Sequence, residues 1–320
     1  MRKLFIFTFL ISGFLVNTAF AQIGSSIINP ELNIELQPEF PRPGEVVTAT
    51  LNDYSGGTYG SNVSWVLDGQ VVTEALNQRS TQFTAGAVGV NQKIEVVLSK
   101  PQGGKEVLER TVKPVYLDIV IEPQTRVPNF YLGRSLPSIG SIVNATALVS
   151  TDTFMDPDLV YTWRLNQTVL NGGPIRGLNQ VSFTTPRGGE MVLYLQVTDT
   201  KGNVIVKRAV SIPSVEPTLK FYEVNQLFGT SHRPIVGSLA LIGNSVTVQA
   251  EPFNLDSRVY NNPDLSEWKI NGVNSGNVGG NPYEVTLQRV GFSGYSNLQF
   301  HVRDTTQVLQ GARDSIQINF

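Results

Sequence analysis

The sequence contains no cysteine. No disulfide can therefore stabilise the fold, although exported proteins often use them. A lipid-modified cysteine is excluded too, which closes that route of membrane anchoring. The fold must be held by burial of apolar side chains, which make up 41% of the residues.

Histidine is nearly absent: His232 and His301 are the only two. Neither has a His, Cys or carboxylate partner at a metal-ligand spacing. The nucleophile motif G-x-S-x-G does not occur, and the sequence places no two carboxylates together as glycosidase chemistry requires. We therefore expect no enzyme, no cofactor and no histidine metal site. His301 alternates with Phe300 and Val302, so we expect it to face solvent.

Charge is sparse, at 16% of residues, and no run of one sign occurs. The net charge of −2 becomes −4 if Arg2 and Lys3 are removed with a cleaved amino-terminal segment. Nucleic-acid binding needs a concentrated basic face, and electrostatic membrane binding needs basic clusters. We expect neither.

Long apolar runs are absent except at the amino terminus. Arg2 and Lys3 precede an apolar run from Leu4 to Val16, and Ala19-Phe20-Ala21 follows. The run is shorter than the about 20 residues that span a membrane. The pattern predicts a cleaved signal peptide at residues 1–21, with Gln22 as the mature terminus. We expect a secreted or cell-envelope surface protein with no transmembrane segment after cleavage.

The three tryptophans recur about every 100 residues, which is the ordinary size of a β-sandwich domain. Each lies in a similar motif, of which the fullest is Tyr161-Thr162-Trp163-Arg164-Leu165-Asn166. Apolar residues alternate with a period of two, and Gly and Pro separate the runs. We predict an all-β chain of three tandem immunoglobulin/PKD-like β-sandwich modules, at residues 30–115, 116–214 and 215–320.

The alternation also predicts where the indoles lie. Tyr161, Trp163 and Leu165 should point to one side of their strand. We expect Trp65, Trp163 and Trp268 to be core residues, and sugar-stacking platforms are the alternative. Three residues after each tryptophan stands an Asn or Asp, which favours a tight turn between strands: Asp68, Asn166 and Asn271.

Several motifs resemble those of bacterial PKD-like and immunoglobulin-like domains. They are Tyr161–Asn166, the Gly172-Gly173 turn, Phe183 and Val197–Gly202. Such domains are known mainly as extracellular spacers and adhesion modules. The resemblance therefore implies an exported, non-enzymatic role.

Other segments are similar to secreted three-module proteins of candidate-phyla bacteria (Patescibacteria). They are Pro128–Gly133, Leu219–Asn225 and Ala250–Phe253. This second likeness implies a cell-surface setting and no known activity.

Aspartates cluster before two of the tryptophan strands. They are weak candidates for calcium, which needs six to eight oxygens, because no spaced D-x-D-x-D-G pattern is present. The alternative is that they cap local turns. The candidates are Asp152, Asp156 and Asp158, with Asp256 and Asp264 in module three.

Two aromatic pairs occupy comparable positions at the entry to modules two and three: Phe130 with Tyr131, and Phe221 with Tyr222. We expect them to pack at the joints between modules, and exposed contacts for a partner are the alternative. The loop Asp53–Gly60 contains Tyr54 and Tyr59 and is the best candidate for a recognition loop, because tyrosine offers large contact area at low entropic cost.

Two hypotheses of function follow. The first is a surface protein that acts as a spacer or as an adhesion or assembly component. The second is a carbohydrate-binding accessory module of a secreted or envelope system. The expected partner is an unknown protein or glycan at the cell surface. The last strand, Ser315–Phe320, should pair within its own module, although a terminal strand can also pair with a partner's sheet.

Overall fold

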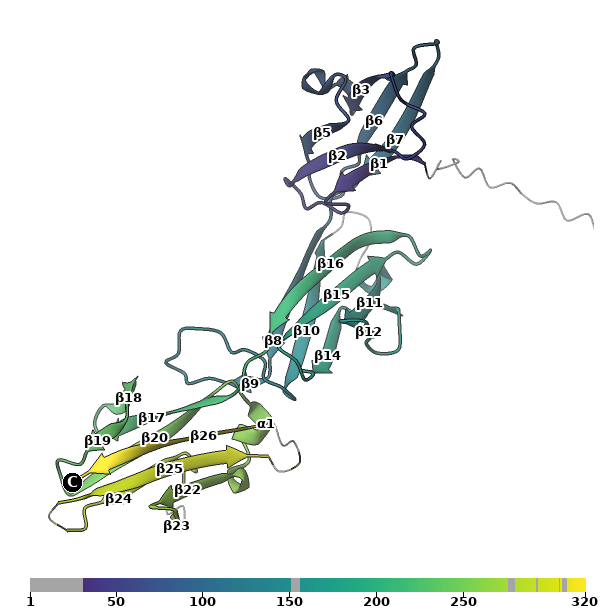
Figure 1. Ribbon diagram of the computed structural model, residues 1–320. Helices are drawn as coiled ribbons and strands as arrows, with labels where there is room; N and C mark the ends of the chain where they lie inside the picture. The colour runs from purple at the N-terminus through teal and green to yellow at the C-terminus, as the bar shows by residue number, and fades with distance from the viewer. Residues whose placement is uncertain (1–30, 151–155, 276–279, 292, 305, 307–309) are drawn as a thin grey trace, which may run out of the picture. The chain divides into compact units, whose positions relative to one another are not determined.

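The computed structural model describes residues 31–150, 156–275, 280–291, 293–304, 306 and 310–320 (Figure 1). The predicted signal peptide lies outside them. The chain forms two compact units. Within the described residues, the first unit comprises the part up to Leu36, Thr48–Gln82 and Lys93–Arg110. The second unit comprises Gln37–Val47, Phe83–Gln92 and Thr111–Phe320.

The fold is all-β, which confirms the predicted class. The helices in the described residues are single turns. They are η1 (Thr73–Ala75), η2 (Asp156–Asp158), η3 (Pro263–Leu265) and α1 (Ser257–Tyr260). The sheets occur in pairs along the chain and define tandem β-sandwich domains of the immunoglobulin/fibronectin-III type.

Module one contains a three-stranded and a four-stranded sheet. The first has the order β1 (Leu32–Gln37), β2 (Val46–Asp53), β5 (Ser80–Thr84). The second has the order β4 (Gln70–Val71), β3 (Asn62–Leu67), β6 (Gln92–Ser99), β7 (Lys105–Val112). Burial alternates along β6, where Ile94, Val96 and Leu98 are fully buried.

Module two repeats this plan. One sheet has the order β14 (Gln180–Thr184), β10 (Ile142–Ser150), β8 (Tyr116–Pro123). The other has the order β12 (Thr168–Val169), β11 (Val160–Leu165), β15 (Glu190–Thr198), β16 (Val204–Pro213), and β13 (Ile175–Arg176) also pairs with β11. Both sheets contribute to one core around Tyr161 and Trp163.

Module three is the largest pair of sheets. One has the order β18 (Gly229–Pro234), β17 (Thr218–Asn225), β20 (Ser245–Phe253), β24 (Glu284–Gln288). The other has the order β19 (Ser238–Ala240), β26 (Gly311–Asn319), β25 (Tyr295–Arg303), β22 (Ser266–Ile270), β23 (Val273–Ser275). The predicted last strand thus lies inside a sheet of its own module, between β25 and β19.

The turn after each tryptophan strand has the same geometry three times. Asp68, Asn166 and Asn271 all have positive φ, between 48° and 54°. Each side-chain Oδ1 accepts a hydrogen bond from a backbone N–H of the facing strand, at 2.7, 2.9 and 2.8 Å. Asn and Asp tolerate the left-handed backbone conformation, and their short side chains can reach the facing strand to accept this hydrogen bond. The residue type at this position therefore specifies the hairpin turn locally.

One pair of short strands links module two to module three. β9 (Thr125–Arg126) pairs antiparallel with β21 (Leu255–Asp256). The amide of Asn254 also donates to the carbonyl of Arg126 at 2.7 Å, and Leu136 N–H donates to Asn254 Oδ1 at 2.8 Å. The two modules therefore share backbone hydrogen bonds as well as a linker.

Candidate functional sites

The three tryptophans are enclosed in the cores of their modules. Trp65, Trp163 and Trp268 are 0%, 1% and 2% exposed. Each indole Nε1–H donates to a carbonyl just before the returning strand, namely that of Gln78 (2.9 Å), Leu178 (3.0 Å) and Pro282 (3.0 Å). A ring buried on both faces cannot stack on a sugar, so these residues serve the fold.

The candidate calcium aspartates of module two bind protein groups. Asp158 forms an ion pair with Arg176, whose Nε also donates to the carbonyl of Pro157 at 2.9 Å. Asp152 lies outside the described residues, and Asp156 is placed only as part of η2. Among the described residues, no group of three or more His, Cys, Asp or Glu side chains is arranged to hold a metal ion.

The module-three aspartates differ from each other in environment. Asp264 lies in the exposed turn η3, where its N–H donates to Asn262 Oδ1 at 3.2 Å. Asp256 is fully buried, with its two oxygens held by Arg258 Nε at 2.9 Å and Nη2 at 2.8 Å. This ion pair lies at the joint between modules two and three.

The loop after β2 is wound around one carboxylate. Asp53 Oδ1 accepts from Ser55 N at 3.1 Å and Gly56 N at 2.8 Å, and Oδ2 accepts from Thr58 N at 2.8 Å and Thr58 Oγ1 at 2.5 Å. The hydrogen bonds from Thr58 are the main reason that the pKa of Asp53 is well below its ordinary value. A loop held this way keeps its shape without burial.

That loop presents the two tyrosines to solvent. Tyr54 is 75% exposed and Tyr59 is 91% exposed. With Asp53, Gly56 and Arg79 they line a shallow cavity of ≈ 350 Å³ in module one. Two exposed rings on a preformed loop can offer contact area to a partner without paying for loop ordering.

Of the four aromatic residues at the module entries, three lie at the joint between modules two and three and one lies in the core. Phe130 packs edge-on against Tyr222 with ring centroids 5.1 Å apart, and Tyr131 packs edge-on against Phe253 at 5.4 Å. Phe221 instead lies in the core of module three beside Trp268, at 6.0 Å. Adjacent residues of a strand point to opposite faces, so Phe221 and Tyr222 cannot both meet the joint.

A buried polar network fills the joint between modules two and three. Gln310 is fully buried; its Nε2 donates to Ser138 Oγ at 3.1 Å and to the carbonyl of Ile139, and its Oε1 accepts from Asp256 N at 3.3 Å. Arg258 Nη2 reaches the carbonyl of Gly140 at 3.1 Å. Buried polar groups that are fully paired fix one geometry, because any shift leaves a donor or acceptor unsatisfied.

Glu251 is a buried carboxylate that the sequence pattern does not single out. It lies on the face of β20 opposite the core, where alternation predicts solvent, yet it is only 4% exposed. Its Oε1 accepts from Gln249 Nε2 at 2.6 Å, while Oε2 has no hydrogen-bond partner among the described residues. Burial raises its pKa, and the nearby Arg126 partly offsets this.

His301 lies on the face of β25 opposite the buried Phe300 and Val302, as alternation predicts, and it is half-buried there. It pairs across the sheet with Glu267 on one side and Arg313 on the other. Burial, with a smaller contribution from Arg303, lowers its pKa. His232 stacks on Phe130 at 4.9 Å.

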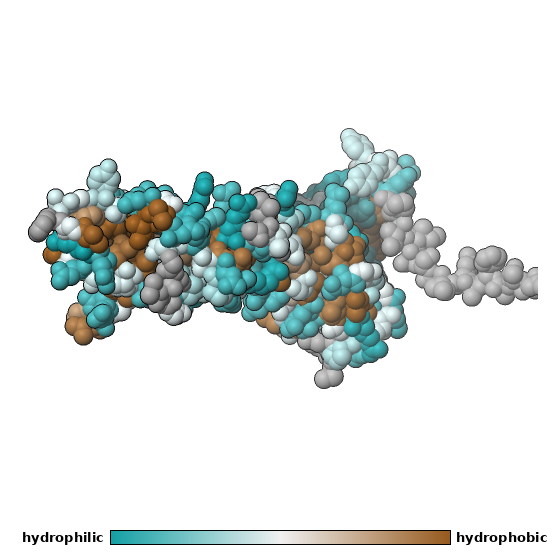
Figure 2. Space-filling model, turned by 90° about the horizontal axis from the view of Figure 1, so that it is seen from below, coloured by the Kyte–Doolittle hydropathy of each residue, from teal (hydrophilic) through white to brown (hydrophobic). Residues whose placement is uncertain are grey.

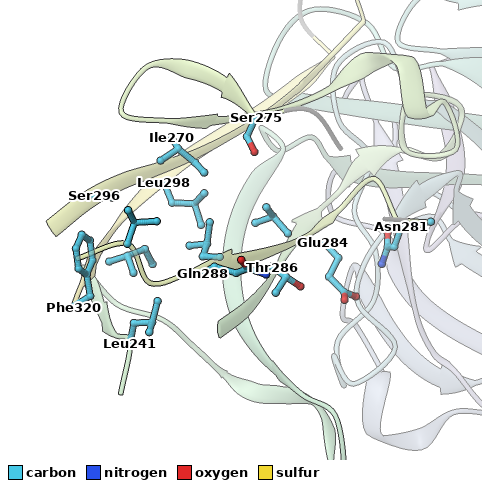
Figure 3. Close-up of a pocket in the computed structure, with 15 residues that line it drawn as sticks. Leu241, Ile270, Ser275, Asn281, Glu284, Thr286, Gln288, Ser296, Leu298 and Phe320 are labelled. Atoms are coloured by element: carbon cyan, nitrogen blue, oxygen red, sulfur yellow. The ribbon is translucent and has the colours of Figure 1, made fainter. Parts of the chain in front are cut away.

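A cavity of ≈ 660 Å³ lies in module three. Figure 3 shows Ile270 and Leu298 on one side of it and the strand of Glu284, Thr286 and Gln288 on the other. Glu284 is the one ionisable group among its described lining residues. Its described lining thus contains one carboxylate, whereas glycosidase chemistry uses two.

Apolar areas on the surface are interrupted by polar ones. Figure 2 shows this as brown areas divided by teal on the face it presents. Within the residues that the structure describes, none of the helices has the length and apolarity needed to cross a bilayer.

No family model matches the chain, and no curated protein matches it. Solved structures with a similar plan include three N-terminal domains of the bacteriophage RB49 highly immunogenic outer capsid protein (12% identity, TM-score 0.25, 90% of this chain and 97% of that one). Another belongs to a 1.5-MDa bacterial ice-binding adhesin and was solved to explain how that adhesin is retained at the host cell surface (11% identity, TM-score 0.26, 90% of this chain and 95% of that one).

A third is the SGBP-B protein of the Bacteroides ovatus mixed-linkage glucan utilization locus, solved in complex with a mixed-linkage heptasaccharide. It has 13% sequence identity and a TM-score of 0.23, and the match covers 87% of this chain and 64% of that one. At TM-scores of this size, none of these likenesses bears on what the present chain does. The class rests on its own sheets: it is a tandem array of immunoglobulin/fibronectin-III-like β-sandwich domains.

Proposed function

We propose that the protein is a non-enzymatic, exported surface protein that acts as a spacer or as an adhesion or assembly component. The observation that supports this best is the joint between modules two and three. It combines strand pairing of β9 with β21 and the buried contacts of Gln310 and Asp256. A spacer must transmit a fixed geometry from one module to the next, and a flexible linker would not do so.

The absence of cysteine makes a distance measurement straightforward. The full mature chain with Gln180→Cys and Glu223→Cys, both exposed strand positions in modules two and three, takes two spin labels. Electron–electron distance spectroscopy should give one narrow distribution. It should broaden in Gln310→Ala, whereas exposed Gln317→Ala serves as the matched control. A broad distance distribution in the unaltered chain would argue against the role as a spacer.

Fractionation of the cells that produce the protein tests separately whether it is exported.

A second function is supported by the Asp53 loop. Carbohydrate-binding accessory modules need exposed rings held in place, and Tyr54 and Tyr59 fit that description. Binding on a glycan array that disappears in Tyr54→Ala and Tyr59→Ala would support this function. Binding that persists in both variants would exclude the loop as the site.

A further inference from the structure

In module two, the outward face of the sheet that contains Trp163 carries an arginine beside an exposed tyrosine. On β11 and β15, Trp163 and Leu195 face the core, so their neighbours Arg164 and Tyr194 project outward. These two residues lie directly opposite each other, and Ala209 of β16 follows Tyr194 in the same row. Tyr194 is 45% exposed. The small Ala209 leaves space beside its ring.

The adjacent row adds polar groups and a second cation. Thr162, Gln196 and Lys207 are consecutive cross-strand partners. Together the two rows line a cavity of ≈ 520 Å³ on the sheet. The cations among its described lining residues on this face are Arg164 and Lys207, and the described lining contains no Asp or Glu. Arg208 also borders the cavity, but it pairs with the core-facing Leu195. In a chain with a net charge of −2, this concentration of positive charge stands out.

No residue that the structure describes neutralises the guanidinium of Arg164. Within the described chain it has no ion pair and no hydrogen bond. Lys207 is partly compensated, because Glu39 lies 3.6 Å away in the same compact unit. The next carboxylate along the face, Glu190 of β15, is bound by Ser211. The charge of Arg164 is therefore available to a ligand.

The other two modules provide internal comparisons at the same rows. In module one the positions of Arg164 and Tyr194 are taken by Val66 and Glu95, and Lys93 neutralises Glu95 at 3.0 Å. In module three they are taken by Lys269 and Gln299, and Lys269 pairs with Glu267 at 3.1 Å. The exposed ring beside an available guanidinium is thus a feature of module two and does not come from the repeated fold.

We propose that this face binds an acidic polysaccharide, a chain of sugars that carry carboxylates. The guanidinium fork of Arg164 matches a carboxylate, and the ring of Tyr194 offers a flat apolar surface to a sugar. The side chains of Thr162 and Gln196 provide donors and acceptors for hydroxyls. A neutral glycan would leave Arg164 unused, and an acidic peptide would not need the ring and the neutral amide.

This inference deepens the carbohydrate-binding function and rests on it, but it places the site in module two. The test is isothermal titration of the full mature chain with polygalacturonate at low and physiological salt. We expect binding that weakens with salt, because the site is exposed. Arg164→Ala should reduce affinity about tenfold or more, as loss of a charged hydrogen bond does. Tyr194→Ala should also reduce affinity, because it removes the apolar ring on which a sugar would stack. Arg164→Lys should recover only part of the loss.

Matched controls distinguish binding at this site from non-specific attraction between charges and from loss of the fold. Lys269→Ala, at the equivalent position of module three, should leave affinity unchanged, and all variants should keep their thermal midpoint. Equal binding by Arg164→Ala would overturn the proposal, as would equally tight binding of neutral dextran or of polyglutamate. If Tyr54→Ala with Tyr59→Ala abolished binding and Arg164→Ala did not, this site would fail while the carbohydrate-binding function stood.

Discussion

At the residue scale, the burial of Glu251 depends on the residues that pack over it and not on its own strand position. Its own strand gives it an outward direction, and Lys220 is its cross-strand partner. Tyr222 of the same face is also buried, and its ring meets Phe130 from module two. The face that Glu251 shares with Tyr222 is therefore partly covered by a residue of module two, which no local pattern reveals.

The buried carboxyl gives a prediction about pH. Because burial raises the pKa of Glu251, the folded protein keeps the proton at pH values where the unfolded chain has released it. Stability should then fall as pH rises from the ordinary glutamate value through the raised value. Glu251→Gln removes this loss and should raise the free energy of unfolding by roughly 1–2 kcal/mol at pH 8, with little gain at pH 4.

Urea denaturation of both proteins at several pH values measures this difference. The charged neighbours to be considered are Arg126 on β9 and Lys220 on β17, with His232 nearby on β18 through its stacking on Phe130. Glu223→Gln, which changes an exposed carboxylate on β17, is the control. A gain that did not grow with pH would show that the carboxyl is not the cause.

At the scale of elements, the same hairpin occurs three times with different amounts of sheet around it. The turn residues Asp68, Asn166 and Asn271 and the indole bonds are equivalent, because both depend on a few neighbouring residues. The outer faces differ from module to module, since alternation leaves them free to vary. The shared elements specify the sandwich, and the outer positions determine what each module can contact.

The final strand gives an element-scale prediction. β26 lies between β25 and β19, and its Ile316 and Ile318 are 5% and 2% exposed. Deleting Ser315–Phe320 removes both side chains, each of which contributes about 2–5 kcal/mol against truncation, and leaves β19 without its partner. We expect module three to unfold, as measured by its urea midpoint and by protease sensitivity.

The control for this deletion is Ser315→Ala, which changes an exposed side chain of the same strand and should leave the midpoint in place. Retention of the full thermal stability by the truncated chain would mean that β26 is dispensable. It would then be open to pairing with the sheet of another molecule.

At the scale of the whole molecule, modules two and three should unfold together. Their joint shares the β9–β21 pair, the Gln310 contacts, and the guanidinium of Arg126 over the ring of Tyr260 at 5.0 Å. Unfolding either module exposes these groups, so calorimetry should show one transition for the two modules. Gln310→Ala should split or broaden it, whereas Gln317→Ala should not. Two separate transitions in the unaltered chain would contradict the coupling.

The sequence by itself determined the all-β class, the repeated tryptophan strand and the hairpin turn that follows it. Those features depend on alternation and on the backbone preferences of Asn, Asp and Gly, which act over a few residues. It also indicated Phe130 and Tyr222 as joint residues. Phe221 was grouped with them by adjacency in the sequence, but it faces the core because neighbouring strand residues point to opposite sides.

Only the tertiary structure decided which surfaces are covered. The burial of Glu251, the half-buried His301, the Gln310 network and the exposed Arg164 beside Tyr194 all arise from strand register and from segments distant in sequence. Alternation assigns a side chain to a face of a sheet. Whether that face meets water, another module or a cavity depends on long-range packing, which a local pattern does not encode.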